Sequence, residues 1–159
     1  MKTKEHLPLI GVGPIYVSII IACTVAGIAL GKTEVFKSGQ IAALKIPFMV
    51  LGIVLIAFGL YLWASANFQA KLGDNIKSNT LVTTGVYAHV RNPIYSAFML
   101  MCTGALLIAN NLWLLILPVF YWMFMTFFMK NTEEKWLYNL YGEPYREYCK
   151  RVNRCIPWF

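Results

Sequence analysis

The stretch IAALKIPFMVLGIVLIAFGLYLWASA, from Ile41 to Ala66, decides the fold because it contains a single charged residue, Lys45, near its start. With a rise of about 1.5 Å per residue, a helix of this length can cross a hydrocarbon core of roughly 30 Å. The run from Ile10 to Leu30 has no charged residue. It is too long for the apolar region of a signal peptide and has no obvious cleavage site, so we expect it to be retained.

Two shorter apolar runs follow, from Ile94 to Ala109 and from Leu112 to Met129, with only Asn110-Asn111 between them. This spacing predicts a tight helical hairpin in which the two asparagines turn the chain. The protein is 58% hydrophobic and 13% charged. We therefore predict an all-α integral membrane protein with four transmembrane helices and a C-terminal cytoplasmic helical segment. Residues 1–159 form one domain, in which 1–66 hold two N-terminal helices and 67–159 hold a loop, the hairpin and a tail.

The basic residues predict the orientation. With four helices, both termini and the 67–93 loop lie on one side, and this side carries 11 of the 14 Lys and Arg residues. The positive-inside rule places that side, and any active site on it, in the cytoplasm. The net charge of +7 suits contact with anionic lipid headgroups better than binding of nucleic acid. The basic residues of this side are Lys2, Lys4, Lys71, Lys77, Arg91, Lys130, Lys135, Arg146, Lys150, Arg151 and Arg154.

The four cysteines do not predict disulfides or a metal site. Cys23 and Cys102 lie in membrane runs, whereas Cys149 and Cys155 lie in the predicted cytoplasmic tail, where thiols stay reduced. There is no Cys-x-x-Cys motif, and two histidines cannot build a metal site alone. We expect free structural cysteines and no bound metal.

Polar residues gather at the cytoplasmic end of the third helix. Proline favours the first position of a helix, so Asn92 before Pro93 is a candidate N-cap. A helix N-terminus can receive a carboxylate or a phosphate, and Arg91 would add positive charge. The alternative is a capped helix with a snorkelling arginine. Tyr87 and Tyr95 flank this turn, where tyrosines also serve as simple interfacial anchors.

The tail is predicted to be helical from Asn131 to Tyr141-Gly142 and again from Glu143-Pro144. With about 100° per residue, Glu133 falls on the apolar face with Trp136 and Leu140, Glu134 on its flank and Lys135 opposite. A carboxylate on an inward face must be paired or hydrogen-bonded. Glu133 could therefore hold a cationic or hydroxyl-rich ligand, or it could be an acidic residue favoured by the helix dipole.

These segments resemble the isoprenylcysteine carboxyl methyltransferase family and, more loosely, its phospholipid N-methyltransferase relatives. The resemblance covers roughly residues 67–157, over half the chain. Each motif is a weak signal alone, but the order and spacing of the motifs together are specific. The similar residues are Asn79-Thr80-Leu81-Val82-Thr83-Thr84-Gly85-Val86-Tyr87, Arg91-Asn92-Pro93-Ile94-Tyr95, Glu133-Glu134, Leu137, Tyr141-Gly142, Tyr145, Tyr148, Val152 and Ile156-Pro157.

The resemblance implies a membrane methyltransferase that uses S-adenosylmethionine. Two departures concern the acceptor: the family often has histidine at the position of Asn92, and its substrate-contacting arginine falls on Met129, next to Lys130. Met129, Lys130 and Arg91 are thus candidate substrate residues. The residues implied to bind the cofactor are Asn79, Thr80, Leu81, Val82, Tyr87, Asn92, Pro93, Tyr95 and Glu133.

The family's type reaction is methylation of a prenylcysteine carboxylate, which needs alignment and exclusion of water but no acid or base residue. The expected partners are a lipophilic or lipidated acceptor and membrane lipids. Three alternatives stay open: a phospholipid amine methyltransferase, an NADPH-dependent membrane reductase of the sterol type, and a small non-enzymatic scaffold. The sequence does not define the oligomeric state.

Overall fold

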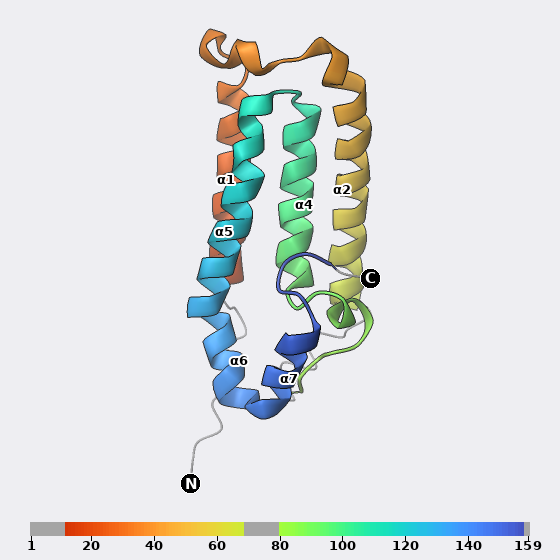
Figure 1. Cartoon of the computed structure of the whole chain (residues 1–159), viewed down its shortest axis with the longest axis vertical. Helices are drawn as coiled ribbons and strands as arrows, with labels where there is room; N and C mark the ends of the chain where they lie inside the picture. The colour runs from red at the N-terminus through yellow and green to blue at the C-terminus, as the bar shows by residue number, and fades with distance from the viewer. Residues whose placement is uncertain (1–11, 69–79, 158–159) are drawn as a thin grey trace.

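A computed structural model describes residues 12–68 and 80–157, and this part of the chain is helical with no strand. Four helices run side by side (Figure 1): α1 (Gly13–Leu30), α2 (Lys45–Phe68), α4 (Pro93–Ile108) and α5 (Ile116–Asn131). Two short helices, α6 (Glu133–Tyr141) and α7 (Glu143–Arg151), cover one end of the bundle. Short 3-10 helices occupy Glu34–Gly39, Ala42–Leu44, Gly85–Ala88 and Leu112–Leu115.

The all-α membrane fold is confirmed, although the number of full spans is approximate. Three helical segments are long and apolar enough to cross a membrane: Gly13–Leu30, Ala42–Phe68 and Leu112–Tyr141. The remaining apolar helix, α4, has 16 residues. At 1.5 Å per residue it is about 24 Å long, which is shorter than a typical span. The predicted third helix is therefore present, but it does not reach across a full hydrocarbon core by itself.

The close packing of α2 against α4 depends on glycine. A Cβ atom on Gly52 would lie 2.6 Å from the carbonyl oxygen of Gly104, and a Cβ on Gly104 would lie 2.5 Å from the carbonyl oxygen of Gly52. Neither position tolerates a side chain without separating the two backbones. Small residues of this kind drive association of helices in membranes, where no hydrophobic effect holds apolar helices together.

The turn between α4 and α5 also fixes the turn between α1 and α2. Asn110 adopts a positive φ of 50°, and the side chain of Asn111 accepts a hydrogen bond from the backbone N–H of Trp113. Both asparagines thus turn the chain, as the sequence predicted. In addition, the buried Asn111 amide donates to the carbonyl oxygens of Gly31 at 3.1 Å and Phe36 at 2.9 Å. One side chain therefore joins the two turns at this end of the bundle.

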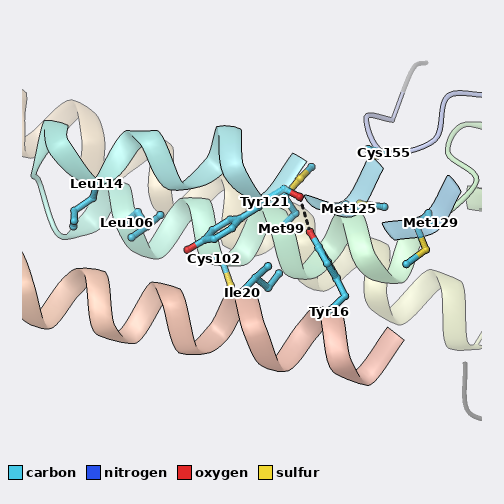
Figure 2. Packing of buried hydrophobic residues seen from close by; sticks show 10 residues of the cluster. All are labelled: Tyr16, Ile20, Met99, Cys102, Leu106, Leu114, Tyr121, Met125, Met129 and Cys155. Atoms are coloured by element: carbon cyan, nitrogen blue, oxygen red, sulfur yellow. Dashed lines mark hydrogen bonds between the residues drawn. The ribbon is translucent and has the colours of Figure 1, made fainter. Parts of the chain in front are cut away.

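The core between α1, α4 and α5 contains tyrosines whose hydroxyl groups are satisfied (Figure 2). Tyr16 donates a hydrogen bond of 3.4 Å to the carbonyl oxygen of Tyr121. The hydroxyl groups of Tyr121 and Thr24 lie 2.8 Å apart. Buried polar groups are costly in an apolar medium unless they are paired. These bonds let large aromatic side chains fill the core without an unpaired hydroxyl group.

The tail follows the predicted pattern of two helices. Helix α5 ends at Asn131, Thr132 breaks the helical conformation with φ −125° and ψ −92°, and α6 begins at Glu133. Helix α6 ends before Gly142, and α7 carries Pro144 in its first turn. The four cysteines are free, as expected.

Candidate functional site

Three helices meet at the carboxylate of Glu133. This residue begins α6, and Tyr95, in the first turn of α4, donates a hydrogen bond of 2.7 Å to its Oε1 atom. Backbone N–H groups of Val12 and Gly13, at the N-terminus of α1, also hydrogen-bond to Glu133. The unsatisfied N–H groups and partial positive charge of a helix N-terminus favour a carboxylate there. Glu133 is therefore held as an ordered, half-buried acceptor at the end of the bundle.

Tyr87 lies near this carboxylate. It is buried in the 3-10 helix Gly85–Ala88 and packs against Leu62 and Ala97. Burial, followed by the nearby charge of Glu133, raises the pKa of the Tyr87 phenol above its ordinary value. Tyr148 of α7 donates a hydrogen bond of 2.5 Å to the carbonyl oxygen of Tyr87. The tyrosine is thus fixed between α2, α4 and α7, and it remains protonated at neutral pH.

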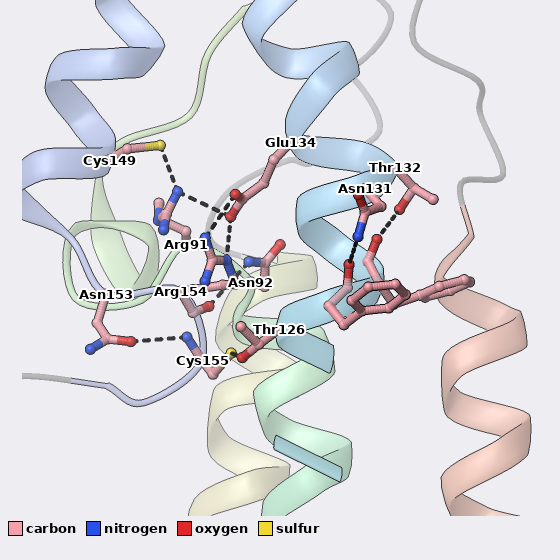
Figure 3. A network of polar contacts seen from close by, with 12 residues as sticks. Arg91, Asn92, Thr126, Asn131, Thr132, Glu134, Cys149, Asn153, Arg154 and Cys155 are labelled. Carbon is pink, nitrogen blue, oxygen red and sulfur yellow. Dashed lines mark hydrogen bonds and ion pairs between the residues drawn. The ribbon is translucent and has the colours of Figure 1, made fainter. Parts of the chain in front are cut away.

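Glu134, rather than Glu133, is the more deeply buried of the two glutamates. Figure 3 shows the side chains of Arg91 and Arg154 directed at its carboxylate. Arg154 binds both of its oxygens, from Nε at 2.6 Å and Nη2 at 2.9 Å. Arg91 Nη1 lies 3.1 Å from Glu134 Oε1, and both of these side chains are 8% exposed. Two guanidinium groups around one carboxylate leave this buried cluster with a surplus positive charge.

The prediction that Glu134 lies on the flank of α6 was therefore wrong. Trp136, which was expected on the inward face, is 39% exposed, whereas Leu137 and Tyr141 pack against the cluster that contains Tyr145 and Tyr148. The buried face of α6 is rotated toward Glu134 because α6 packs on α7 and on the segment after it, as well as on the membrane helices. Lys135 is exposed, as predicted.

The segment after α7 folds back over the turn before α4. The backbone N–H of Arg91 donates to the carbonyl oxygen of Asn153 at 2.8 Å. The hydroxyl group of Ser96 donates to the carbonyl oxygen of Cys155 at 2.5 Å. Asn92 occupies the N-cap position of α4, but its side chain does not cap the helix. Its amide instead donates to the carbonyl oxygen of Arg154 at 3.1 Å. The predicted capping by the Asn92 side chain is therefore corrected, since Asn92 holds the returning segment.

The other predicted cofactor residues surround this region, except that Asn79 lies outside the described residues. Thr80 is exposed, and Pro93 is buried at the first position of α4. Leu81 packs against the cluster of Tyr145 and Tyr148, and Val82 packs against that of Tyr87. This short segment therefore lies between α7 and the membrane bundle.

The predicted substrate residues occupy three different environments. Met129 is fully buried in the core of α1, α4 and α5. Lys130 is exposed. Arg91 is committed to Glu134 and to a hydrogen bond with Cys149 Sγ, yet its buried Nε atom has no hydrogen-bond partner among the residues that the structure describes. The structure thus brings together Tyr87, Tyr95 and Glu133. Of the predicted substrate residues, Arg91 and Met129 are buried, whereas Lys130 is exposed.

Sequence reasoning missed Arg154 and the N-terminus of α1. Arg154 lies in a basic tail, where nothing in its local pattern distinguishes it from the exposed Lys150 and Arg151. Two tail features could have suggested that the segment after α7 is fixed. The buried Tyr145 and Tyr148 lie on one face of α7, and Val152 follows them.

Comparison with known proteins agrees with this architecture. Residues 47–144 match the model of the phospholipid methyltransferase family, and the chain belongs to this family. The resemblance drawn from the motifs is confirmed. No solved structure matches the chain.

The curated relatives carry two related names. Protein-S-isoprenylcysteine O-methyltransferase of Schizosaccharomyces pombe is 33% identical over 110 residues, which cover 64% of this chain and 46% of that protein. The protein of the same name from Homo sapiens is 34% identical over 119 residues, 69% of this chain and 41% of its own. Phosphatidylethanolamine N-methyltransferase of Clavispora lusitaniae is 28% identical over 138 residues, 81% of this chain and 16% of its own. The chain thus spans less than half the length of these relatives.

Proposed function

We propose that this protein transfers a methyl group from S-adenosylmethionine to a lipophilic acceptor, and that the acceptor group is a carboxylate of the prenylcysteine type. One observation carries the proposal. Glu133 is an ordered carboxylate where α1, α4 and α6 meet, beside Tyr87 and Tyr95. The residues from α4 to α6 lie within the region that matches the family model.

The side chains of this end fit such a cofactor. The Glu133 carboxylate can accept hydrogen bonds from hydroxyl or ammonium groups, and the rings of Tyr87 and Tyr95 provide apolar faces for a planar base. The Arg91 Nε atom is a buried donor without a partner among the described residues. We assign binding of the cofactor to Thr80, Leu81, Val82, Tyr87, Asn92, Pro93, Tyr95 and Glu133, together with Asn79.

The residues of this chain contribute by holding the cofactor and the acceptor in position. S-adenosylmethionine supplies a methyl group that is already activated by its sulfonium, so a carboxylate acceptor needs no general base. Tyr95 and the N-terminus of α1 hold Glu133 in one orientation, and the segment after α7 closes over the turn before α4. Alignment of two reactants and exclusion of water are the main contributions that a protein makes to such a transfer.

We further propose that the cofactor enters from the cytoplasm and the acceptor from the membrane, between helices. Lys and Arg residues concentrate at the end of the bundle that holds α6 and α7, which is the cytoplasmic end under the positive-inside rule. Met129 lies in the core beside this end and Arg91 in its buried ion cluster. These two residues are better placed than the exposed Lys130 to contact an acceptor.

Methylation of a phospholipid amine is the second candidate function. It is favoured by the relative from Clavispora lusitaniae, whose name specifies phosphatidylethanolamine as its substrate. Transfer of labelled methyl groups to S-farnesyl cysteine or to vesicles that contain phosphatidylethanolamine would distinguish the two acceptors.

The first experiment is calorimetric binding of S-adenosylhomocysteine to the purified protein in nanodiscs. We expect saturable binding, a loss of more than tenfold in affinity for Glu133→Ala, and little change for Lys135→Ala on the exposed side of the same helix. Wild-type affinity in Glu133→Ala would contradict the role of this carboxylate. Absence of binding in folded wild-type protein, with binding of NADPH instead, would favour a reductase.

A further inference from the structure

A cavity of about 410 Å³ lies at the end of the bundle opposite Glu133. Its apolar walls come from α1, α2 and α4 and include Ile28, Ile56, Ala105 and Ile108. At 1.5 Å per residue, about 15 Å of α4 separates Tyr95 from Ala105. The volume falls within the range of roughly 300–1,000 Å³ that is common for small-molecule sites. The cavity is therefore a separate site from the proposed cofactor region.

The rim of the cavity is polar, and most of its polar groups are already engaged. Gln40 donates to the carbonyl oxygen of Gly31 at 3.3 Å. Asn111 donates to Gly31 and Phe36 and accepts from Trp113. The side-chain amides of Gln40 and Asn111 therefore bind backbone groups of the turns, and these bonds fix the shape of the cavity opening.

Lys32 is the remaining polar group of the rim. It is exposed two residues after the end of α1, and it lines the cavity. Among the described residues, no side chain forms an ion pair or hydrogen bond with its ammonium group. By contrast, the neighbouring Lys37 pairs with Glu34 at 3.2 Å. Lys32 is thus the one unpaired cation among the described residues that line the cavity, and it stands beside apolar walls.

We propose that this cavity binds one phospholipid, with an acyl chain against Ile28, Ile56, Ala105 and Ile108 and the phosphate at Lys32. An acyl chain suits apolar walls formed by three membrane helices. A phosphate complements the unpaired ammonium group, which lies where lysines near helix ends reach the interface. The bound lipid would fill the space between α1 and α2 and support the end of α4, which has only 16 residues.

Native mass spectrometry tests the headgroup contact and the acyl site. Protein in detergent is incubated with palmitoyl-oleoyl phosphatidylglycerol or with the diacylglycerol of the same chains. We expect one retained phospholipid per chain and at least a tenfold preference over the diacylglycerol.

Lys32→Gln should remove the preference for the phospholipid and Lys37→Gln should keep it. Ala105→Phe, which fills the cavity, should abolish retention, whereas Ala57→Phe on the exposed face of α2 should not. Equal retention by Ala105→Phe and wild type would overturn the proposal.

A second measurement needs no variant and decides the matter if Ala105→Phe fails to fold. A phosphatidylglycerol with a diazirine at the end of one acyl chain is crosslinked to the wild-type protein, and the modified peptides are sequenced. We expect crosslinks at Ile28, Ile56 and residues 105–109. Crosslinks spread over the exposed face of α2 would indicate ordinary surface lipid and overturn the proposal. Displacement of the phospholipid by S-farnesyl cysteine would assign the cavity to a methyl acceptor and overturn it as well.

Discussion

Tyr95 and Glu133, which are 38 residues apart in the sequence, are joined by a hydrogen bond of 2.7 Å between the phenol and Oε1. The bond connects the first turn of α4 to the first residue of α6. It therefore fixes the carboxylate of the proposed cofactor site relative to the membrane bundle, although Thr132 breaks the helix just before it.

Tyr95→Phe removes this bond and keeps the ring. A hydrogen bond to a charged group contributes about 1.5 kcal/mol or more, so we expect roughly tenfold weaker binding of S-adenosylhomocysteine. Isothermal titration calorimetry measures the change. Tyr61→Phe, on the exposed side of α2, is the matched control and should bind as the wild type does. Unchanged affinity in Tyr95→Phe would mean that Glu133 needs no orientation by this residue.

Glu134→Gln leaves Arg91 and Arg154 without their counter-charge. Removing one partner of a buried ion pair costs about 3–5 kcal/mol, so we expect a marked loss of stability in thermal unfolding followed by circular dichroism in detergent. Glu147→Gln is the control, because the Glu147–Lys150 pair is largely exposed, and it should leave the unfolding temperature unchanged. A wild-type unfolding temperature in Glu134→Gln would show that the ion cluster does not hold the tail in place.

Gly104→Val forces α2 away from α4, because the new Cβ atom would lie 2.5 Å from the carbonyl oxygen of Gly52. Overpacking of this kind costs about 1–3 kcal/mol. We expect unfolding at lower dodecyl sulfate fractions in mixed micelles, where helix content reports the folded state. Ala57→Val, on the exposed face of α2, should unfold as the wild type does. Equal stability of the two variants would contradict the close contact between the helices.

The orientation can be measured with a membrane-impermeant maleimide on cells, in a background where Cys23 and Cys149 are replaced by serine. Ser38→Cys introduces a thiol at the end of the bundle near the α1–α2 turn, and Glu147→Cys introduces one on α7 at the opposite end. We expect Ser38→Cys to react from outside and Glu147→Cys only after permeabilisation. The reverse pattern would invert the proposed sidedness.

The helices and the Tyr95–Glu133 region could be predicted because apolar runs, Pro and Gly positions and local motifs act over short distances. The pairing of Glu134 could not, because its partners come from the turn before α4 and from the segment after α7. The helical-face argument considered only the residues of α6, so it placed Trp136 inward and missed the rotation imposed by α7. In the same way, Asn111 was expected to turn its own hairpin, but its bonds to Gly31 and Phe36 depend on another turn.

The return of residues 153–155 over the turn before α4 has a consequence for the order of biosynthesis. The ribosome releases α1, α2 and α4 first, so these helices can enter the membrane while Arg91 and Ser96 still lack the backbone carbonyl groups that they will bind. The proposed catalytic end can close only after Cys155 has emerged. Membrane insertion of the helices and completion of this end are therefore separate events, and a chain that lacks Arg154 and Cys155 would also lack the contacts that hold the turn before α4.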